Sequence, residues 1–322
     1  MAGKVVFDLP SVTLAIDQRP TASRVSQSLA TTSPEPFPVI VGCPRSGTSL
    51  LAVMLDAHPE LAVPPETSFL GLIASLRGEG AALRQRTFEI MTADRITISN
   101  WSDFGLDKDE LRRRLEAIEP FDLGAGVRAF YSLYAERERK PRVGEKTPGY
   151  IFAMPQIAAL LPEARFIHVI RDPRDTALSW RKTWFAPSQD FAVLGLAWKT
   201  NVEAGRRAGT MLQHYMEIRY EDLVTRSEPT LRRVCAFLSL AFTSSMLDYC
   251  AHGETRIARL QGRSLPDGRM VSREQRARIH ANLAQPPLSD RIDVWRREMS
   301  DADRRRLEQA VGPLVHELGY SA

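Results

Sequence analysis

The chain has 322 residues, of which 43% are hydrophobic and 25% are charged, and its formal net charge is +4. This is the composition of an ordinary globular protein, and the length is sufficient to bury a sizeable core in one large domain or two small ones. The slight basic excess suits an anionic ligand. Because the Lys and Arg residues are spread among nearly as many acids, we expect no nucleic-acid partner.

Cysteine usage and hydropathy indicate the compartment. Cys43, Cys235 and Cys250 form no Cys-x-x-Cys pair and cannot all pair within one chain, so a reducing compartment is the simpler expectation. The N-terminus lacks the long apolar core of a secretory signal, and no apolar run approaches the roughly 20 residues that a membrane span needs. We expect a cytoplasmic protein without stable membrane insertion. The sequence predicts no particular oligomeric state.

The first residues differ from the rest of the chain. Residues 20–38 are rich in Ser, Thr, Ala and Pro, which is typical of a linker or an extended arm. We therefore expect an N-terminal arm or linker over residues 1–36 and a single domain over residues 37–322.

Strands and helices alternate through this domain. Apolar runs too short for helices predict strands over Pro38–Val41, Phe166–Ile170 and Met216–Arg219. Apolar residues at helical spacing predict helices over Ser49–Ala57, Asp107–Glu119, Leu123–Arg139, Ile151–Leu161, Phe191–Arg207, Glu228–Leu238 and Asp301–Leu318. Asp172 can cap a further helix that follows the second strand, with Pro173 at its first position. The alternation predicts an α/β protein of three layers, with helices flanking a central parallel sheet.

The segment from His252 to Asp290 breaks this pattern. It contains three glycines and three prolines, and we expect a long loop region of the kind that often acts as a lid.

A phosphate-binding loop is predicted between the first strand and the first helix. Gly42–Ser49 reads Gly-Cys-Pro-Arg-Ser-Gly-Thr-Ser, in which glycines allow close backbone approach and the hydroxyls and Arg45 add donors. The alternative is a tight turn without a ligand, but a bare turn does not need these donors together. An ATP or GTP loop would carry Lys where Thr48 stands. A cysteine phosphatase would carry Arg where Ser49 stands, so Cys43 is better explained as a small filler residue.

The loop and its following residues, Gly-Cys-Pro-Arg-Ser-Gly-Thr-Ser-Leu-Leu, resemble the 5′-phosphosulfate loop of sulfotransferases that use 3′-phosphoadenosine-5′-phosphosulfate (PAPS). The resemblance is strongest to the branch with Pro-Arg-Ser-Gly-Thr, which includes bacterial enzymes and tyrosylprotein sulfotransferases. It implies a fold like that of P-loop NTPases. It also implies that Arg45, Ser46, Gly47, Thr48 and Ser49 bind the donor.

A donor with a 3′-phosphate needs a second anion site. Arg171 follows the second strand, where open α/β sheets place ligands, and Ser179 lies two turns along the next helix. The resemblance implies that both hold the 3′-phosphate and that Tyr220, in Arg-Tyr-Glu-Asp-Leu, lines the nucleotide pocket. The alternatives are an ion pair of Arg171, a surface Ser179 and a packed Tyr220.

Glu66 and Lys146 are the candidate catalytic residues. In the resembled branch, a Glu before Thr at this point is the base, which implies that role for Glu66; it could instead be the first acid of a helix over Thr67–Leu76. A Lys-containing turn implies that Lys146, together with Arg45, stabilises the sulfuryl group and the leaving phosphate, although Lys146 could be an ordinary surface residue. His168 is a weaker base candidate, because it lies inside a predicted strand. The six histidines form no ligand-spaced cluster, and we expect no metal.

The C-terminal match is looser. Arg291–Arg297 resembles the segment that covers the nucleotide in relatives, but Asp293 and Val294 stand where many relatives carry Gly and a basic residue. Arg291 or Arg296 could take over the phosphate contact.

The leading hypothesis is transfer of a sulfuryl group from PAPS to a hydroxyl or amine of a small-molecule or carbohydrate acceptor, with adenosine 3′,5′-bisphosphate as the product. The alternatives are a nucleotide-dependent phosphotransferase on the same scaffold and a nucleotide-binding protein without activity.

Overall fold

The computed structural model describes residues 35–95, 98–265, 268–287 and 289–320. The described residues belong to one compact unit, Pro34–Ala322. Almost all of the expected N-terminal arm, residues 1–34, lies outside the described residues, and the boundary at residue 37 stays a prediction.

A four-stranded parallel sheet forms the centre of this unit. Its strands lie in the order β6 (Glu145–Lys146), β1 (Phe37–Gly42), β7 (Ala164–Ile170) and β8 (Tyr215–Arg219). The register pairs Ile40 with Lys146 on one side and with Ile167 on the other. All three strands predicted from the sequence are therefore present, and β6 is an additional edge strand.

Alternation along the strands supplies a core to each face of the sheet. Val39, Val41 and Phe166 point to one face, whereas Ile40 and Ile167 point to the other, as the two-residue period of a strand requires. All five side chains are at most 1% exposed. Burial of each such side chain stabilises the fold by roughly 1.5–3 kcal/mol.

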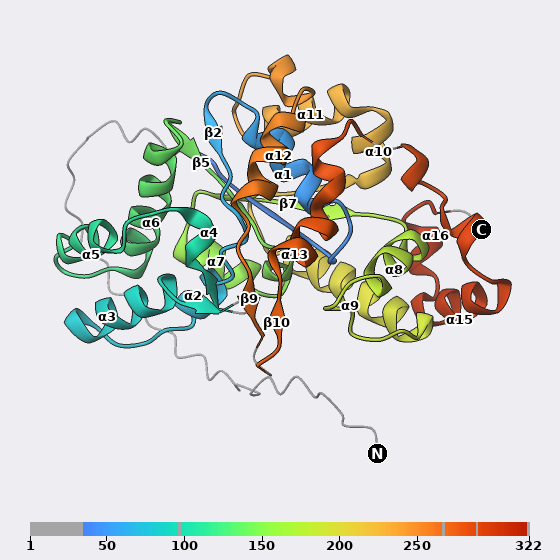
Figure 1. Ribbon diagram of the computed structural model, residues 1–322, viewed down its shortest axis with the longest axis horizontal. Coiled ribbons are helices and arrows are strands. Elements are labelled where there is room, and N and C mark those ends of the chain that lie inside the picture. The colour runs from blue at the N-terminus through green and yellow to red at the C-terminus, as the bar shows by residue number, and fades with distance from the viewer. Residues whose placement is uncertain (1–34, 96–97, 266–267, 288, 321–322) are drawn as a thin grey trace. The chain divides into compact units, whose positions relative to one another are not determined.

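The helices fall into three groups, which Figure 1 shows around the sheet. The Ile40 face packs against α1 (Thr48–Asp56), α10 (Tyr220–Thr225), α11 (Ser227–Phe237), η2 (Ser244–Met246), the start of α12 (Cys250–Arg259) and η3 (Ala281–Ala284). The Val39 face packs against α2 (Leu70–Ala74), α3 (Gly80–Met91), α4 (Trp101–Phe104), α5 (Lys108–Glu116), α6 (Leu123–Arg137), η1 (Pro148–Phe152) and α7 (Met154–Leu160). A third core joins α8 (Pro173–Arg181), α9 (Phe191–Gly209), α14 (Trp295–Glu298), α15 (Asp301–Val311) and α16 (Leu314–Glu317).

The remaining elements are short. β2 (Leu61–Ala62) pairs in parallel with β5 (Arg142–Val143), and the antiparallel pairs are β3 (Asp94–Arg95) with β4 (Ser99–Asn100), and β9 (Arg263–Ser264) with β10 (Met270–Val271). η4 (Ser289–Arg291) precedes the C-terminal group. The prediction of a three-layer α/β protein is confirmed. No helix in the described part of the chain is long and apolar enough to cross a membrane.

The structure corrects three predicted elements. The segment His252–Asp290 is not a long loop, because it contains most of α12, the β9–β10 hairpin and α13 (Arg273–His280). The helix predicted over Asp301–Leu318 is broken after Val311, where Gly312 has a φ of 68° and Pro313 follows. The helix predicted over Thr67–Leu76 shortens to α2, so Glu66 lies in the preceding loop.

Candidate active site

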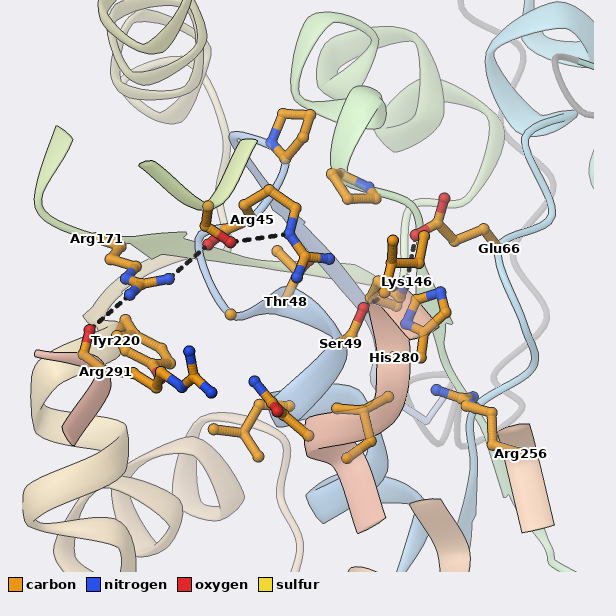
Figure 2. Close-up of a pocket in the computed structure, with 18 of the residues that line it drawn as sticks. Arg45, Thr48, Ser49, Glu66, Lys146, Arg171, Tyr220, Arg256, His280 and Arg291 are labelled. Carbon is orange, nitrogen blue, oxygen red and sulfur yellow. Dashed lines mark hydrogen bonds and ion pairs between the residues drawn. The ribbon is translucent and has the colours of Figure 1, made fainter. Parts of the chain in front are cut away.

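A pocket of about 400 Å³ opens at the carboxyl ends of the parallel strands, where open α/β sheets bind ligands. Its lining comes from the loops after β1 and β7, the loop before α2, β6, the start of α10, and the α12–α13 region. Figure 2 shows the labelled side chains from these elements converging on one space. The predicted site residues that line it are Arg45, Gly47, Thr48, Ser49, Glu66, Lys146, Arg171, Ser179 and Tyr220.

The loop between β1 and α1 presents backbone donors to the pocket. Gly47 adopts a φ of 97°, and α1 begins directly after it at Thr48. The first N–H groups of a helix generally have no intrahelical partner. At this end the Leu50 N–H bonds back to Gly47 O over 3.0 Å, whereas those of Thr48 and Ser49 can bind an anion. Ser46, by contrast, is fully buried and does not line the pocket; its Oγ lies beneath Gly42 and has no hydrogen-bond partner among the described residues.

Arg45 lies between the two predicted phosphate sites. Its Nε donates to Ser179 Oγ over 3.2 Å, which links the loop to α8. Burial, followed by the charge of Arg171, lowers the pKa of Arg45 to about 10. Arg45 is therefore still protonated at neutral pH, and the proximity of two guanidinium groups favours an anion between them.

Arg171 is held rigidly at the end of β7. Its Nη1 donates to Arg45 O over 3.2 Å, its Nη2 donates to Arg291 O over 2.7 Å, and its guanidinium lies 4.4 Å from the centre of the Tyr220 ring. Its Nε is buried without a partner among the described residues.

The segment that follows Arg291 is anchored by Asp175. The Asp175 carboxylate accepts from the N–H groups of Asp293 and Trp295, each over 2.9 Å. Burial raises the pKa of Asp175 to about 6. Asp175 thus anchors this segment. Asp172 caps α8 by accepting from Arg174 N, as predicted.

Arg291 and Arg296 are the two predicted candidates for a phosphate contact from the segment Arg291–Arg297, and only one of them faces the pocket. Arg291 lines the pocket, whereas Arg296 lies outside the lining and stacks on Trp295, 4.2 Å from the ring centre. Arg291 is therefore the residue of the two that can reach a ligand in the pocket.

Glu66 and Lys146 form an ion pair inside the pocket, across 80 positions of the sequence. Lys146 Nζ donates to Glu66 Oε1 and, over 3.2 Å, to Ser49 Oγ. The Lys146 side chain is 4% exposed, whereas that of Glu66 is 39% exposed. Burial lowers the pKa of Lys146, and the carboxylate of Glu66 opposes this shift. Lys146 is therefore not the solvated surface residue that the sequence left possible.

A buried polar network lies behind this pair. Glu145 accepts from Tyr131 Oη over 2.7 Å and from Thr147 Oγ1 over 2.6 Å, and Thr67 Oγ1 lies 2.8 Å from Tyr150 Oη. Burial raises the pKa of Glu145 to about 7. The network thus fixes the residues next to Glu66 and to Lys146 in sequence.

His168 lies outside the pocket. It is buried in β7, and its Nδ1 lies 2.7 Å from Tyr215 Oη. This is the structural role that its position within a strand predicts.

One side of the pocket was not predicted from the sequence. Asn100, Arg256, Arg276 and His280 line it, and three of the four come from the segment that was predicted to be a loop. The sequence does contain a signal for the start of α13, because Ser272 and Gln275 have the spacing of a capping box and form one there. The imidazole of His280 is neutral at neutral pH, since burial and then the charges of Lys146 and Arg45 lower its pKa well below the usual range.

No group of three or more His, Cys, Asp or Glu side chains that could hold a metal ion is present among the described residues. That the chemistry needs no metal stays a prediction.

The fold and the site together define a class: an α/β protein whose strand–loop–helix presents an anion site at the sheet edge, next to a buried acid–lysine pair. The model of the family described as "Sulfotransferase family" matches residues 36–244. The chain belongs to this sulfotransferase family and is an enzyme of that class.

Curated relatives agree with this assignment. The nodulation protein NoeE of Sinorhizobium fredii is 26% identical over 317 residues, which cover 88% of this chain and 67% of the relative. Protein-tyrosine sulfotransferase A of Caenorhabditis elegans is 24% identical over 291 residues, with the same coverage of 88% and 67%. The relatives thus include enzymes whose names specify protein tyrosine.

The solved structures that share the fold include two sulfotransferase domains. The sulfotransferase domain of the Synechococcus PCC 7002 olefin synthase superimposes with a TM-score of 0.54 at 20% identity, over 93% of this chain and 100% of that chain. The sulfotransferase domain from the curacin biosynthetic pathway gives a TM-score of 0.55 at 19% identity, over 89% and 98%.

Proposed function

We propose that this enzyme transfers a sulfuryl group from PAPS to a hydroxyl or amine of a small-molecule or carbohydrate acceptor. The observation that supports this most strongly is that one pocket brings together the two predicted phosphate sites and the Glu66–Lys146 pair. A cytoplasmic location stays a prediction.

The donor's two anionic ends fit different parts of the pocket. Arg171 and Ser179 would bind the 3′-phosphate, and the Nε of Arg171 offers a donor that the described residues leave unused. The N–H groups at the start of α1, with Arg45, Thr48 and Ser49, would bind the 5′-phosphosulfate. Tyr220 would lie against the nucleotide between them.

In the transfer, the bond between the sulfur and the phosphate oxygen breaks, and a bond between the sulfur and the acceptor oxygen forms. The acceptor proton passes to Glu66, for which Oε2 is available because the described residues form no hydrogen bond to it. Lys146 lies 3.2 Å from Ser49 Oγ and can stabilise the charge on the sulfuryl group and on the departing phosphate.

Calorimetric titration with adenosine 3′,5′-bisphosphate, beside ATP with magnesium, tests the donor sites. We expect micromolar affinity for the bisphosphate and little for ATP. The Arg171→Ala variant should lose about 1.5–3 kcal/mol of binding free energy, the contribution of a hydrogen bond to a charged group. A preference for ATP, or an unchanged affinity of the variant, would contradict the assigned 3′-phosphate site.

Transfer of labelled sulfate from PAPS to a panel of alcohols, phenols, sugars and amines tests the reaction itself. Tight binding of the bisphosphate without transfer to any of these acceptors, or transfer of phosphate from ATP with magnesium, would contradict the proposed reaction.

A further inference from the structure

Positive charge exceeds negative charge at the end of the pocket that Asn100, Arg256, Arg276 and His280 line, which we call the acceptor end. Figure 2 shows Arg256 on the opposite side of the view from Arg171 and Arg291, with Lys146, Glu66 and His280 on its own side. Arg256 therefore lies beyond the groups that the proposed function assigns to the donor.

The other charges at this end are balanced within the protein. Arg276 donates to Asp103 Oδ2 over 2.7 Å, and Arg263 forms ion pairs with Asp103 at 2.8 Å and with Asp94 at 3.1 Å. Two guanidinium groups thus meet two carboxylates. Lys146 is balanced by Glu66 in the same way.

Arg256 is the exception. It forms no ion pair with a carboxylate within the described residues; its Nη2 donates only to the carbonyl oxygens of Val63 and Pro64, just before Glu66. These two bonds use one nitrogen of the guanidinium and fix its position. The remaining N–H groups form no other hydrogen bond within the described part of the chain.

The charge of Arg256 reaches the reacting groups. It contributes to lowering the pKa of Lys146, and it contributes in the same way to His280, after burial as the largest cause for both. A fixed guanidinium close to the acid–lysine pair and without an acid of its own favours an anion nearby.

We propose that the acceptor carries a carboxylate, which Arg256 binds while the acceptor hydroxyl reaches Glu66. This inference rests on the proposed function and names its substrate class. A carboxylate fits because its two oxygens match the planar fork of an arginine. Its one negative charge would also balance Arg256, which has no acid partner among the described residues. The neutral His280, which lines the same end, can donate or accept a further hydrogen bond without changing this balance.

The test compares matched probes that differ only in charge. The 322-residue chain is saturated with adenosine 3′,5′-bisphosphate, and binding is then measured for 4-hydroxyphenylacetate and its amide, and for 3-hydroxybutanoate and its amide. We expect the carboxylate of at least one pair to bind about 10- to 100-fold more tightly than its amide, the range that a hydrogen bond to a charged group contributes. Arg256→Gln should abolish this preference, and Arg256→Lys should retain part of it.

If Arg256 only holds the Glu66 loop in place, Arg256→Gln should weaken the binding of the carboxylate probe and of the amide probe to the same extent. Arg259→Gln is the matched control, since Arg259 lies on the same helix, pairs with Glu138 at 2.9 Å and does not line this pocket. Equal or undetectable binding of both members in both pairs overturns the carboxylate proposal. Failure to bind the bisphosphate would instead contradict the proposed function, and it is measured first.

Discussion

At the scale of single residues, the assigned base is the most direct test of the chemistry. Glu66→Gln removes the carboxylate that would take the acceptor proton and keeps the shape of the side chain. We expect kcat to fall by about 10²–10⁴-fold, the usual contribution of general acid–base catalysis. The measurement is transfer of labelled sulfate from PAPS, beside calorimetry of bisphosphate binding. A variant with full turnover and intact binding would refute the role of Glu66.

Gly47 is required by geometry rather than by chemistry. Its φ of 97° is unfavourable for other residues, and a Cβ at this position would lie 2.4 Å from the Tyr220 ring. We expect Gly47→Ala to lower the affinity for adenosine 3′,5′-bisphosphate by about 10-fold or more, because the loop or Tyr220 must shift. Gly71→Ala is the control, since its Cβ would meet only Ala153 Cβ at 3.4 Å. Equal affinities of the two variants would contradict this account.

At the scale of elements, one buried acid joins α4 to β9 and α13. Asp103 in α4 is 3% exposed, and it pairs with Arg276 of α13 and Arg263 of β9. Asp103→Asn leaves two guanidinium groups with a weaker partner. Breaking a buried ion pair costs about 3–5 kcal/mol, so we expect a loss of stability of this order in urea unfolding.

The same substitution should loosen the segment that carries Arg256 and His280. We expect limited proteolysis to cleave between residues 250 and 290 sooner in Asp103→Asn than in the unmodified protein. Asp301→Asn is the control, because this acid is 78% exposed and contacts Arg304 at 3.4 Å. Equal proteolysis of the two variants would show that Asp103 does not hold the segment.

At the scale of the whole molecule, Glu145 links stability to pH. Burial raises its pKa to about 7, above the value of 4.5 in an unfolded chain. A raised carboxyl pKa means that the folded state binds the proton more tightly than the unfolded chain does. The resulting contribution of Glu145 to the free energy of unfolding is fully present below pH 4.5 and is lost as the pH rises through 7. The stability advantage of Glu145 over Glu145→Gln should therefore decrease by about 2–3 kcal/mol between roughly pH 5 and pH 8.

Urea unfolding at the two pH values measures this difference. Glu110→Gln serves as the reference, because Arg114 and Arg113 lower the pKa of this partly exposed acid, and it does not titrate in this range. A difference between Glu145 and Glu145→Gln that does not change with pH would contradict a raised pKa.

The sheet, the class of protein and the donor side of the pocket were largely predictable from the sequence. The reason is that these features are local: a buried strand, a tight loop and the helix that follows are consecutive in the chain, so Gly42–Ser49 and Arg171–Ser179 can be interpreted as units. Ser46 is the exception, because only packing shows that its side chain points beneath Gly42 and away from the pocket.

The acceptor end was not predictable, because tertiary packing brings its residues together from distant parts of the chain. Arg256 contacts the Glu66 loop across 192 positions, so no local pattern indicates this contact. The roles of Glu66 and Lys146 were predicted from the resemblance, but the ion pair that joins them across 80 positions was not. The glycines and prolines of residues 252–290 are typical of loops, but packing keeps helices there: a Cβ at Gly253 of α12 would lie 1.9 Å from the Leu283 carbonyl oxygen. Charge balance is likewise a property of the folded chain. Arg276 pairs with Asp103, 173 positions earlier, and Arg263 pairs with the same acid, whereas Arg256 finds no acid within the described residues.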